Sequence, residues 1–112
     1  MNTISWNQFS QIDMRVGTVI QVELFPEAKK PAYKLTLDFG NEIGIKKTSA
    51  QLTKRYTPEQ LLHKQVVAVV NFPPKQIANF MSECLILGAV DQENDVILMQ
   101  PENKVKNGLR IL

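Results

Sequence analysis

The clearest structural signal in the sequence is the alternation of apolar and polar residues in Tyr33-Lys34-Leu35-Thr36-Leu37-Asp38-Phe39. Successive side chains of a β-strand point to opposite faces, so the aromatic and leucine residues of this stretch share one face. Such a strand lies between a core and solvent. The sequence therefore predicts a half-buried strand over residues 33–39. Gly40 and Asn41 then predict a tight turn into a hairpin partner at 43–46.

A longer strand is predicted upstream, over residues 14–24, with its even-numbered residues from Val16 to Leu24 on one face. Gly17 lies inside this strand, which indicates a bulge or a close backbone approach. Apolar runs predict three further strands, at 65–72, 83–90 and 96–99. The sequence predicts a helical turn at 48–52 and a loop or helical turn at 75–82.

Two short helices complete the pattern. Ser5 is a suitable cap for a helix at about 5–11, where Trp6 and Phe9 share a face. Thr57 and Pro58 begin a second helix over 57–62, with a cap followed by proline at the first position. Five principal strands with a helix between the third and fourth indicate an all-β, five-stranded Greek-key barrel. This barrel is of the oligonucleotide/oligosaccharide-binding (OB) type. A small β-sandwich is the alternative, but the strands are too few for it.

The length of 112 residues fits a single domain over residues 1–112, with the helix at 5–11 as an extension. Hydrophobic residues make up 44% and charged residues 21%, which is typical of a globular protein. One cysteine, Cys84, and one histidine, His63, cannot form a disulfide framework or a usual metal site, so we expect no cofactor or metal. Because no apolar run is long enough to span a bilayer and no signal peptide is visible, we expect a cytoplasmic protein without membrane insertion.

The net charge of +2 conceals two oppositely charged segments. Residues 29–55 contain seven Lys or Arg against two Asp or Glu, a net charge of +5. Residues 83–102 contain five Asp or Glu and no Lys or Arg, a net charge of −5. A basic face that binds a polyanion explains the first segment, whereas solvated strand faces and loops explain both without any function.

No catalytic constellation is visible, which favours a binding protein over an enzyme. The stretch Lys46-Lys47-Thr48-Ser49 offers ammonium and hydroxyl groups that can meet phosphate oxygens. Phe72 and Phe80 lie beside turn residues, and they can stack on exposed bases or on unfolded peptide. The alternative for both phenylalanines is a place in the core.

Five blocks of the sequence resemble, in their order and spacing, the stand-alone tRNA-binding domain family. They are DMRVGTV (13–19), KLTLDFG (34–40), TSAQL (48–52), VNFPP (70–74) and SECLILGA (82–89). The resemblance extends from about Phe9 to Leu112. Within the family, which includes the C-terminal appendage of some methionyl-tRNA synthetases, the chain is most similar to the CsaA-type bacterial secretion chaperones.

The resemblance implies an OB barrel that forms a symmetric homodimer, binds tRNA and has no catalytic activity. For the CsaA type it also implies binding of unfolded or preprotein segments and a helper role in export, with the export machinery as a further partner. The alternative function is a pure tRNA-binding module that assists aminoacyl-tRNA synthesis without chaperone activity.

The resemblance and the loop positions give two sets of expected site residues. The nucleic-acid set is Lys46, Lys47, Ser49, Asn71, Lys75, Ser82 and Glu83, and the peptide set is Phe72, Phe80 and Met81. Relatives usually carry glycine where this chain has Asn79, and asparagine tolerates the left-handed backbone better than most residues. Synthetase-type relatives often carry arginine where Ala78 stands, so we expect weaker tRNA affinity here.

Apolar residues at both ends of the chain independently predict a dimer. A barrel this small has little interior room for them, and exposed apolar patches usually mark partner surfaces. The expected interface residues are Trp6, Phe9, Ile12, Leu109, Ile111 and Leu112. The alternative is that both segments plug the ends of the barrel.

Overall fold

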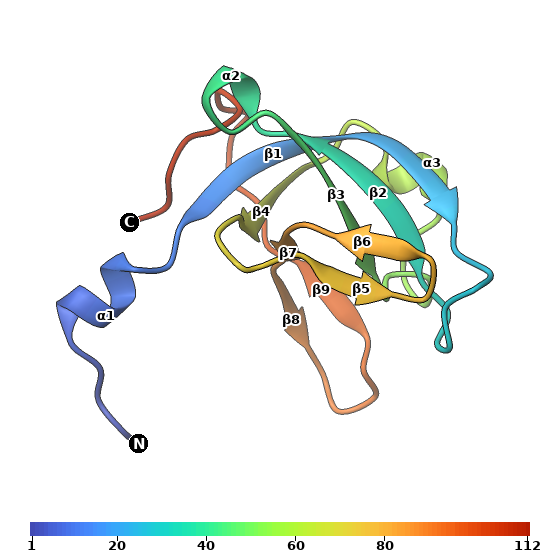
Figure 1. The fold of residues 1–112 in the computed structure, drawn as a ribbon, viewed down its shortest axis with the longest axis horizontal. Coiled ribbons are helices and arrows are strands. Elements are labelled where there is room, and N and C mark those ends of the chain that lie inside the picture. The colour runs from blue at the N-terminus through green and yellow to red at the C-terminus, as the bar shows by residue number, and fades with distance from the viewer.

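The computed structural model describes residues 1–112 as a mostly β structure built around one antiparallel sheet (Figure 1). The strand order is β3–β2–β1–β4–β7, and every neighbouring pair is antiparallel. The strands are β1 (Met14–Leu24), β2 (Tyr33–Asp38), β3 (Ile45–Ala50), β4 (Gln65–Val69) and β7 (Leu85–Ile86). The predicted five-stranded barrel with short flanking helices is confirmed.

The two edge strands of this sheet, β3 and β7, approach each other and nearly close the barrel. The backbone N–H of Glu83 donates to the carbonyl of Lys47 at 2.7 Å, and the Lys47 N–H donates to the Glu83 carboxylate at 2.9 Å. The buried hydroxyl of Thr48 donates to the carbonyl of Cys84 at 2.7 Å and lies 3.0 Å from the Ser82 hydroxyl. Because individual bonds rather than a continuous ladder join the edges, closure depends on the side chains of Thr48, Ser82 and Glu83 together with one backbone bond.

The core lies inside the barrel, and the alternation in residues 33–39 supplies much of it. Burial alternates strictly along β2, and Leu35, Leu37 and Phe39 are fully buried. A Cβ added to Gly17 would lie 2.7 Å from Cε1 of Phe39, so Gly17 allows a close approach as expected. The bulge lies further along β1, where the pairing with β2 shifts between Val19 and Gln21.

That bulge overturns the predicted two-sided pattern of residues 14–24. Val16 and Val19 are both buried although they differ in parity, whereas Ile20 and Leu24 are exposed. One extra residue in a strand reverses which side chains face the core beyond it. Before the bulge the odd-numbered Val19, paired with Leu37, faces the core, and after it the even-numbered Val22, paired with Leu35, does. The expectation that all even-numbered residues share one face is therefore wrong.

Both helix predictions are confirmed, and a third helical turn replaces a predicted tight turn. In α1 (Trp6–Ser10) and α3 (Pro58–Leu61), Ser5 and Thr57 form capping boxes with the glutamines three residues later. The predicted Gly40–Asn41 turn is instead α2 (Gly40–Ile43), which Gly40 enters with a φ of 85°. The chain therefore reverses through a helical turn before β3.

Three other sequence-based assignments are wrong. Residues 48–52, predicted as a helical turn, mostly belong to β3, because pairing with β2 decides their conformation. Residues 75–82 form a hairpin of β5 (Lys75–Ile77) and β6 (Phe80–Ser82). The predicted strand at 83–90 is divided into β7 and β8 (Gly88–Val90), and β8 pairs with β9 (Val96–Leu98) instead of β4.

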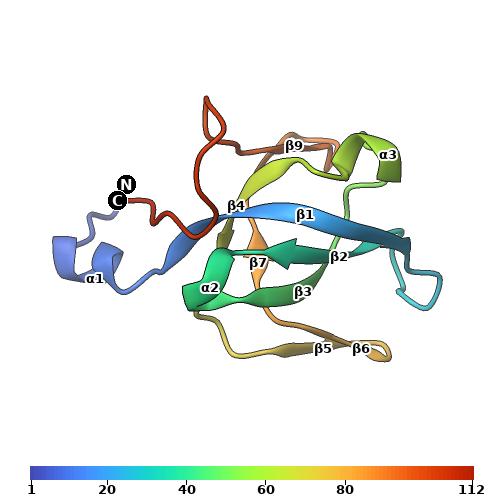
Figure 2. The same cartoon turned by 90° about the horizontal axis from the view of Figure 1, so that it is seen from above.

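The arrangement of these elements separates two sides of the molecule. Figure 2 shows the β5–β6 hairpin on one side of β1, and β9 with the segment that follows it on the other. The helix α1 extends away from the barrel. None of the helices has the length and apolar character needed to cross a membrane.

Candidate nucleic-acid interface

The outer face of β2 and β3 carries four polar side chains. Lys34 is paired with Ser49 and Thr36 with Lys47, and these residues alternate along the strands with the buried Leu35 and Thr48. Side chains paired directly across antiparallel strands lie on the same face of the sheet. We call this surface, made of Lys34, Thr36, Lys47 and Ser49, the β2–β3 face.

The structure separates the adjacent lysines Lys46 and Lys47. Lys46 is paired with the core residue Leu37, is half-buried, and shares its side of the strand with Thr48. Lys47 is exposed and points to the opposite side. The two lysines, predicted together for one nucleic-acid surface, therefore cannot both project from the same face of β3.

Two loops meet above one edge of the β2–β3 face. Phe25 begins the loop after β1, and Phe80 begins β6 in the excursion between β4 and β7. Their ring centroids are 5.5 Å apart, and the Lys34 ammonium lies 5.4 Å from the Phe25 centroid and 5.8 Å from that of Phe80. This Phe25–Lys34–Phe80 cluster joins the loops that flank the face. Phe25 is buried in it, and Phe80 is half-buried.

The β5–β6 hairpin lies beside β3 and presents different residues on its two faces (Figure 1). Lys75 pairs with Ser82, whose hydroxyl reaches Thr48, so this face of the hairpin turns toward the barrel. Met81 lies on the other face and is 46% exposed, and Phe72 in the preceding loop is 54% exposed. Among the predicted peptide-binding residues, Phe72 and Met81 are thus available, whereas Phe80 already packs in the aromatic cluster.

Three predicted nucleic-acid residues use their polar groups within the chain. The Asn71 amide donates to the Gln11 carbonyl at 2.7 Å and accepts from the Asp13 N–H at 3.0 Å, which fixes the segment between α1 and β1. Ser82 and the carboxylate of Glu83 bond to β3 across the closing edges of the barrel. Ser82 and Glu83 therefore hold the edge of the barrel beside the face, and Asn71 holds the segment that leads into β1.

Ion pairs join the basic and acidic segments of the sequence. Lys54 lies 3.7 Å from the Glu93 carboxylate, and the Arg55 guanidinium binds Asp95 through two hydrogen bonds, one of them 3.0 Å long. The hydrogen bonding with Arg55 lowers the pKa of the Asp95 carboxyl. Charge in both segments is therefore partly neutralised between the loop after β3 and the β8–β9 turn.

The lysines near the β2–β3 face, in contrast, make no ion pair. They are Lys29, Lys30, Lys34, Lys47 and Lys75, and the first two lie in the loop that Phe25 begins. Five of the nine lysines that make no ion pair thus lie around this face. Sequence patterns did not single out Lys34 or Phe25, although the alternation at 33–39 already placed Lys34 on the solvent side.

The tip of the β5–β6 hairpin differs in one detail from its sequence-based interpretation. Ala78, with a φ of 50°, adopts the left-handed conformation, while Asn79 does not. The side chain of Gln76 donates to the Ala78 carbonyl at 2.7 Å, which holds this turn. The presence of Asn79 is therefore not what allows the chain to reverse here.

Apolar residues from the two ends of the chain lie together outside the barrel. Trp6 is 74% exposed and Leu112 is 84% exposed, and both line a depression of about 420 Å³ with Ile4, Ser5 and Phe9. No residue of α1 is buried. These segments therefore do not plug the ends of the barrel in this structure.

Comparisons with known proteins agree with this architecture. Residues 14–110 match the family described as "Putative tRNA binding domain". The crystal structure of the chaperone CsaA from Bacillus anthracis is 50% identical, with a TM-score of 0.94, and covers 99% of this chain and 100% of that one. The CsaA chaperone protein from Picrophilus torridus is 49% identical, with a TM-score of 0.91, over 98% of this chain and 100% of that one.

The chain is also similar to one part of a larger protein. The methionine–tRNA ligase of Pyrococcus furiosus is 38% identical over 99% of this chain, which spans only 15% of that protein's length. The family match covers all strands of the barrel, and the similarity to the CsaA structures covers almost the whole chain. The chain therefore belongs to the tRNA-binding domain family, as a CsaA-type member.

Proposed function

We propose that the chain binds tRNA on the β2–β3 face, without catalysis, and also binds unfolded or preprotein segments as an export-related chaperone. One observation carries the RNA assignment: unpaired lysines gather where two loops flank the outer surface of the second and third strands. This is the surface on which OB barrels bind oligonucleotides. We further propose that residues 1–112 act as one unit in the cytoplasm, as a homodimer.

Contact with phosphate is assigned to solvent-accessible polar side chains around the β2–β3 face. Lys47 and Ser49 on β3, together with Lys75 on β5, offer charge and hydroxyl groups to the RNA backbone. Ser82 and Glu83 support this surface through their hydrogen bonds to β3, whereas Lys46 lies on the opposite side of that strand and Asn71 holds the segment between α1 and β1.

The two adjacent lysines of β3 provide a matched test of this assignment. We expect Lys47→Ala to weaken tRNA binding and to reduce the salt dependence of the binding constant by about one unit of slope. Lys46→Ala removes the same charge from the opposite side of the strand, so its effect should be clearly smaller. Fluorescence anisotropy with labelled tRNA over a salt series measures both. Equal losses in the two variants would overturn the assignment to the β2–β3 face.

Binding of unfolded protein is assigned to the exposed apolar side chains next to the same hairpin. Phe72 and Met81 project into solvent, and apolar contacts weaken little as salt rises. We expect Phe72→Ser with Met81→Ser to reduce suppression of client aggregation while tRNA affinity stays the same. A variant that suppresses aggregation as well as the unaltered protein would refute the peptide site.

The homodimer is proposed from the apolar ends of the chain. A second copy related by a two-fold axis can cover Trp6, Phe9 and Leu112 on both protomers at once. We expect sedimentation velocity to show a dimer, and Trp6→Ala with Phe9→Ala to shift it toward monomer. An unaltered dimer in that variant would contradict this interface.

A pure tRNA-binding module is the second candidate, and the similarity to part of methionine–tRNA ligase favours it. In that case the protein would assist aminoacyl-tRNA synthesis without acting on unfolded chains. The two candidates give different results in the aggregation assay. tRNA binding without any suppression of client aggregation would select the module and exclude the chaperone.

A further inference from the structure

A polar depression lies on the opposite side of the barrel from the β5–β6 hairpin. It has a volume of about 680 Å³, and only one of its ten lining residues is hydrophobic. The walls come from β1, from the start of β4, and from the segment after β9 that Figure 2 shows across β1 from the hairpin. The depression is therefore separate from the β2–β3 face.

Hydrogen bonds fix one wall of this depression completely. The Gln65 amide nitrogen donates to the Val105 carbonyl at 2.7 Å and to Oδ1 of Asn107 at 3.1 Å, and its oxygen accepts from the Val105 N–H at 3.0 Å. Because each end of the amide has a partner of the correct kind, its orientation is determined. Gln65 is a rigid part of the wall with no free donor for a ligand.

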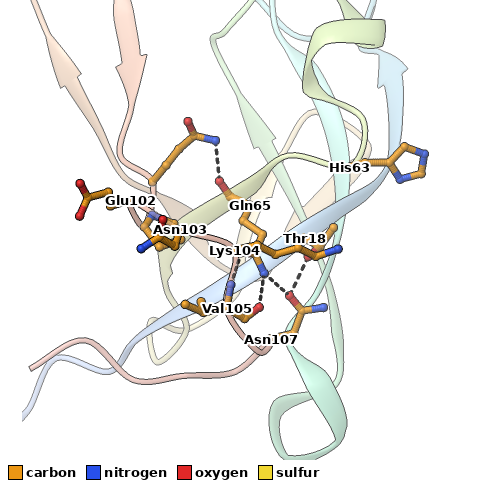
Figure 3. A pocket seen from close by; sticks show the side chains of 10 residues that line it. Thr18, His63, Gln65, Glu102, Asn103, Lys104, Val105 and Asn107 are labelled. Atoms are coloured by element: carbon orange, nitrogen blue, oxygen red, sulfur yellow. Dashed lines mark hydrogen bonds between the residues drawn. The ribbon is translucent and has the colours of Figure 1, made fainter.

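The same bonds orient Asn107 toward the open side. Its Oδ1 accepts from the Thr18 hydroxyl at 2.6 Å as well as from Gln65, which assigns the other position to nitrogen. That Nδ2 has no hydrogen-bond acceptor within the protein, and Figure 3 shows it turned away from the bonded wall. The next residue is held as well, since Gly108 N–H donates to the Val16 carbonyl at 2.7 Å. Asn107 thus presents two preorganised N–H donors.

Two further donor side chains line the depression. Lys104 extends across the depression and makes no ion pair, and His63 lies at its rim (Figure 3). The Glu102 carboxylate also belongs to the lining, but it lies at the opposite end from His63 (Figure 3). Ammonium, imidazole and amide donors on one side indicate an anionic, hydrogen-bond-accepting ligand.

The size and lining of the depression narrow the ligand class further. A volume of about 680 Å³ is far larger than one phosphate group needs, and ligand pockets commonly have such volumes. No phenylalanine, tyrosine or tryptophan lines it, and its only aromatic ring is the His63 imidazole at the rim, so the interior offers no platform on which a base would stack. We propose that this depression binds a ribose phosphate, with the phosphate near Lys104 and His63 and the sugar hydroxyls near Asn107. The ribose phosphate can belong to a free nucleotide or to an RNA strand.

Titrations followed by NMR test the ligand class. We expect AMP and ribose 5-phosphate to shift the amide signals of residues 63–65 and 100–107 with similar affinity, because the base takes no part. Adenosine, which lacks the phosphate, should bind at least about tenfold more weakly. Saturable shifts with AMP identify a free nucleotide as a sufficient ligand, and shifts only with a short single-stranded RNA assign the site to an RNA strand. No shift at these residues with any of the phosphates at millimolar concentration would overturn the proposal.

Side-chain variants then test the named donors. Lys104→Ala should weaken ribose phosphate binding about tenfold, while Lys106→Ala, which removes an exposed lysine outside the lining, should leave it unchanged. At the rim of the depression the variant is His63→Asn. The backbone φ of His63 is 72°, and asparagine tolerates this left-handed conformation. Equal changes in ribose phosphate affinity for Lys104→Ala and Lys106→Ala would refute a specific binding site in the depression. The Lys47→Ala variant should still bind ribose phosphate here, which separates failure of this site from failure of the β2–β3 face.

Discussion

Gly17 offers a sharp test of how tightly this small barrel is packed. A Cβ at this position would lie 2.7 Å from Cε1 and 2.8 Å from Cδ1 of Phe39. Carbon atoms are normally at least about 3.5 Å apart, so Gly17→Ala would require movement of the ring or of β1. Phe39 is fully buried, and because side chains in protein cores are closely packed, movement of its ring has to displace its neighbours. The substitution therefore overpacks the centre of the core.

The expected free-energy change follows from two opposing effects. Overpacking a well-packed core costs about 1–3 kcal/mol. Replacing glycine by alanine in an extended strand returns about 0.4–1 kcal/mol by restricting the unfolded chain. We therefore expect Gly17→Ala to lower the free energy of unfolding by about 1–2 kcal/mol. In a chain of 112 residues this corresponds to a fall in Tm of about 4–8 °C.

A double-mutant cycle with Phe39→Leu isolates this contact. Leucine lacks the ring edge that the new methyl group would meet, so Gly17→Ala should cost little in the Phe39→Leu background. Urea unfolding of the four proteins, followed by circular dichroism, gives the coupling energy, which we expect to be about 1–2 kcal/mol. The same cost of Gly17→Ala in both backgrounds would refute the packing argument, as would an unchanged midpoint in the single variant.

Four further predictions concern the buried residues Cys84 and Thr48 and the hydrogen-bonded Asn71. Burial raises the pKa of the Cys84 thiol to about 12, so native protein should be alkylated at about pH 8 far more slowly than unfolded protein. Because the unfolded thiol loses its proton first, stability should also fall as pH rises from about 9 toward 12, which pH-dependent unfolding measures. Thr48→Val leaves the carbonyl of Cys84 with only the longer, 3.4 Å hydrogen bond from the Ser82 hydroxyl. We expect the free energy of unfolding to fall by about 1–3 kcal/mol, seen as a lower urea midpoint with an unchanged m-value. Asn71→Ala removes the acceptor of the Asp13 amide, which should exchange hydrogen faster while core amides stay protected.

The features that the sequence predicted correctly have local or periodic causes. The alternation at 33–39 is dictated by a core on one side and solvent on the other, and β2 shows the expected burial. The caps at Ser5 and Thr57 involve glutamines only three residues away, so their signals are complete within one helical turn. The close approach at Gly17 was predictable because glycine weakens the interior of a strand and often marks a site where another group comes near the backbone.

The features that were predicted wrongly depend on partners distant in the chain. Residues 48–52 contain hydroxyl and small side chains with weak local preference, and their pairing with β2 makes most of them a strand. The hairpin at 75–82 is held against β3 through Ser82 and Thr48, which are 34 positions apart. A one-residue bulge reversed the faces of β1 beyond Val19, and no local signal marks it.

In the candidate site, too, local features could be predicted from the sequence, whereas spatial relations between distant residues could not. Residue types indicated a basic, phosphate-binding surface, but the sides on which Lys46 and Lys47 project require the register of β3. The cluster of Phe25, Lys34 and Phe80 joins two loops that are far apart in sequence, and no periodicity reveals it.

The way in which the barrel closes also constrains the order of folding. The bonds between β3 and residues 82–84 join positions 33–36 residues apart. The barrel can therefore close only after the two ends of this long intervening segment have come together. While the chain emerges from the ribosome, β1, β2 and β3 can form a meander early, but the free edge of β3 stays unpaired until residue 84 is available. An open strand edge invites pairing with other chains. We therefore expect translation of residues 50–84 to be the period in which the nascent protein itself is most prone to aggregate.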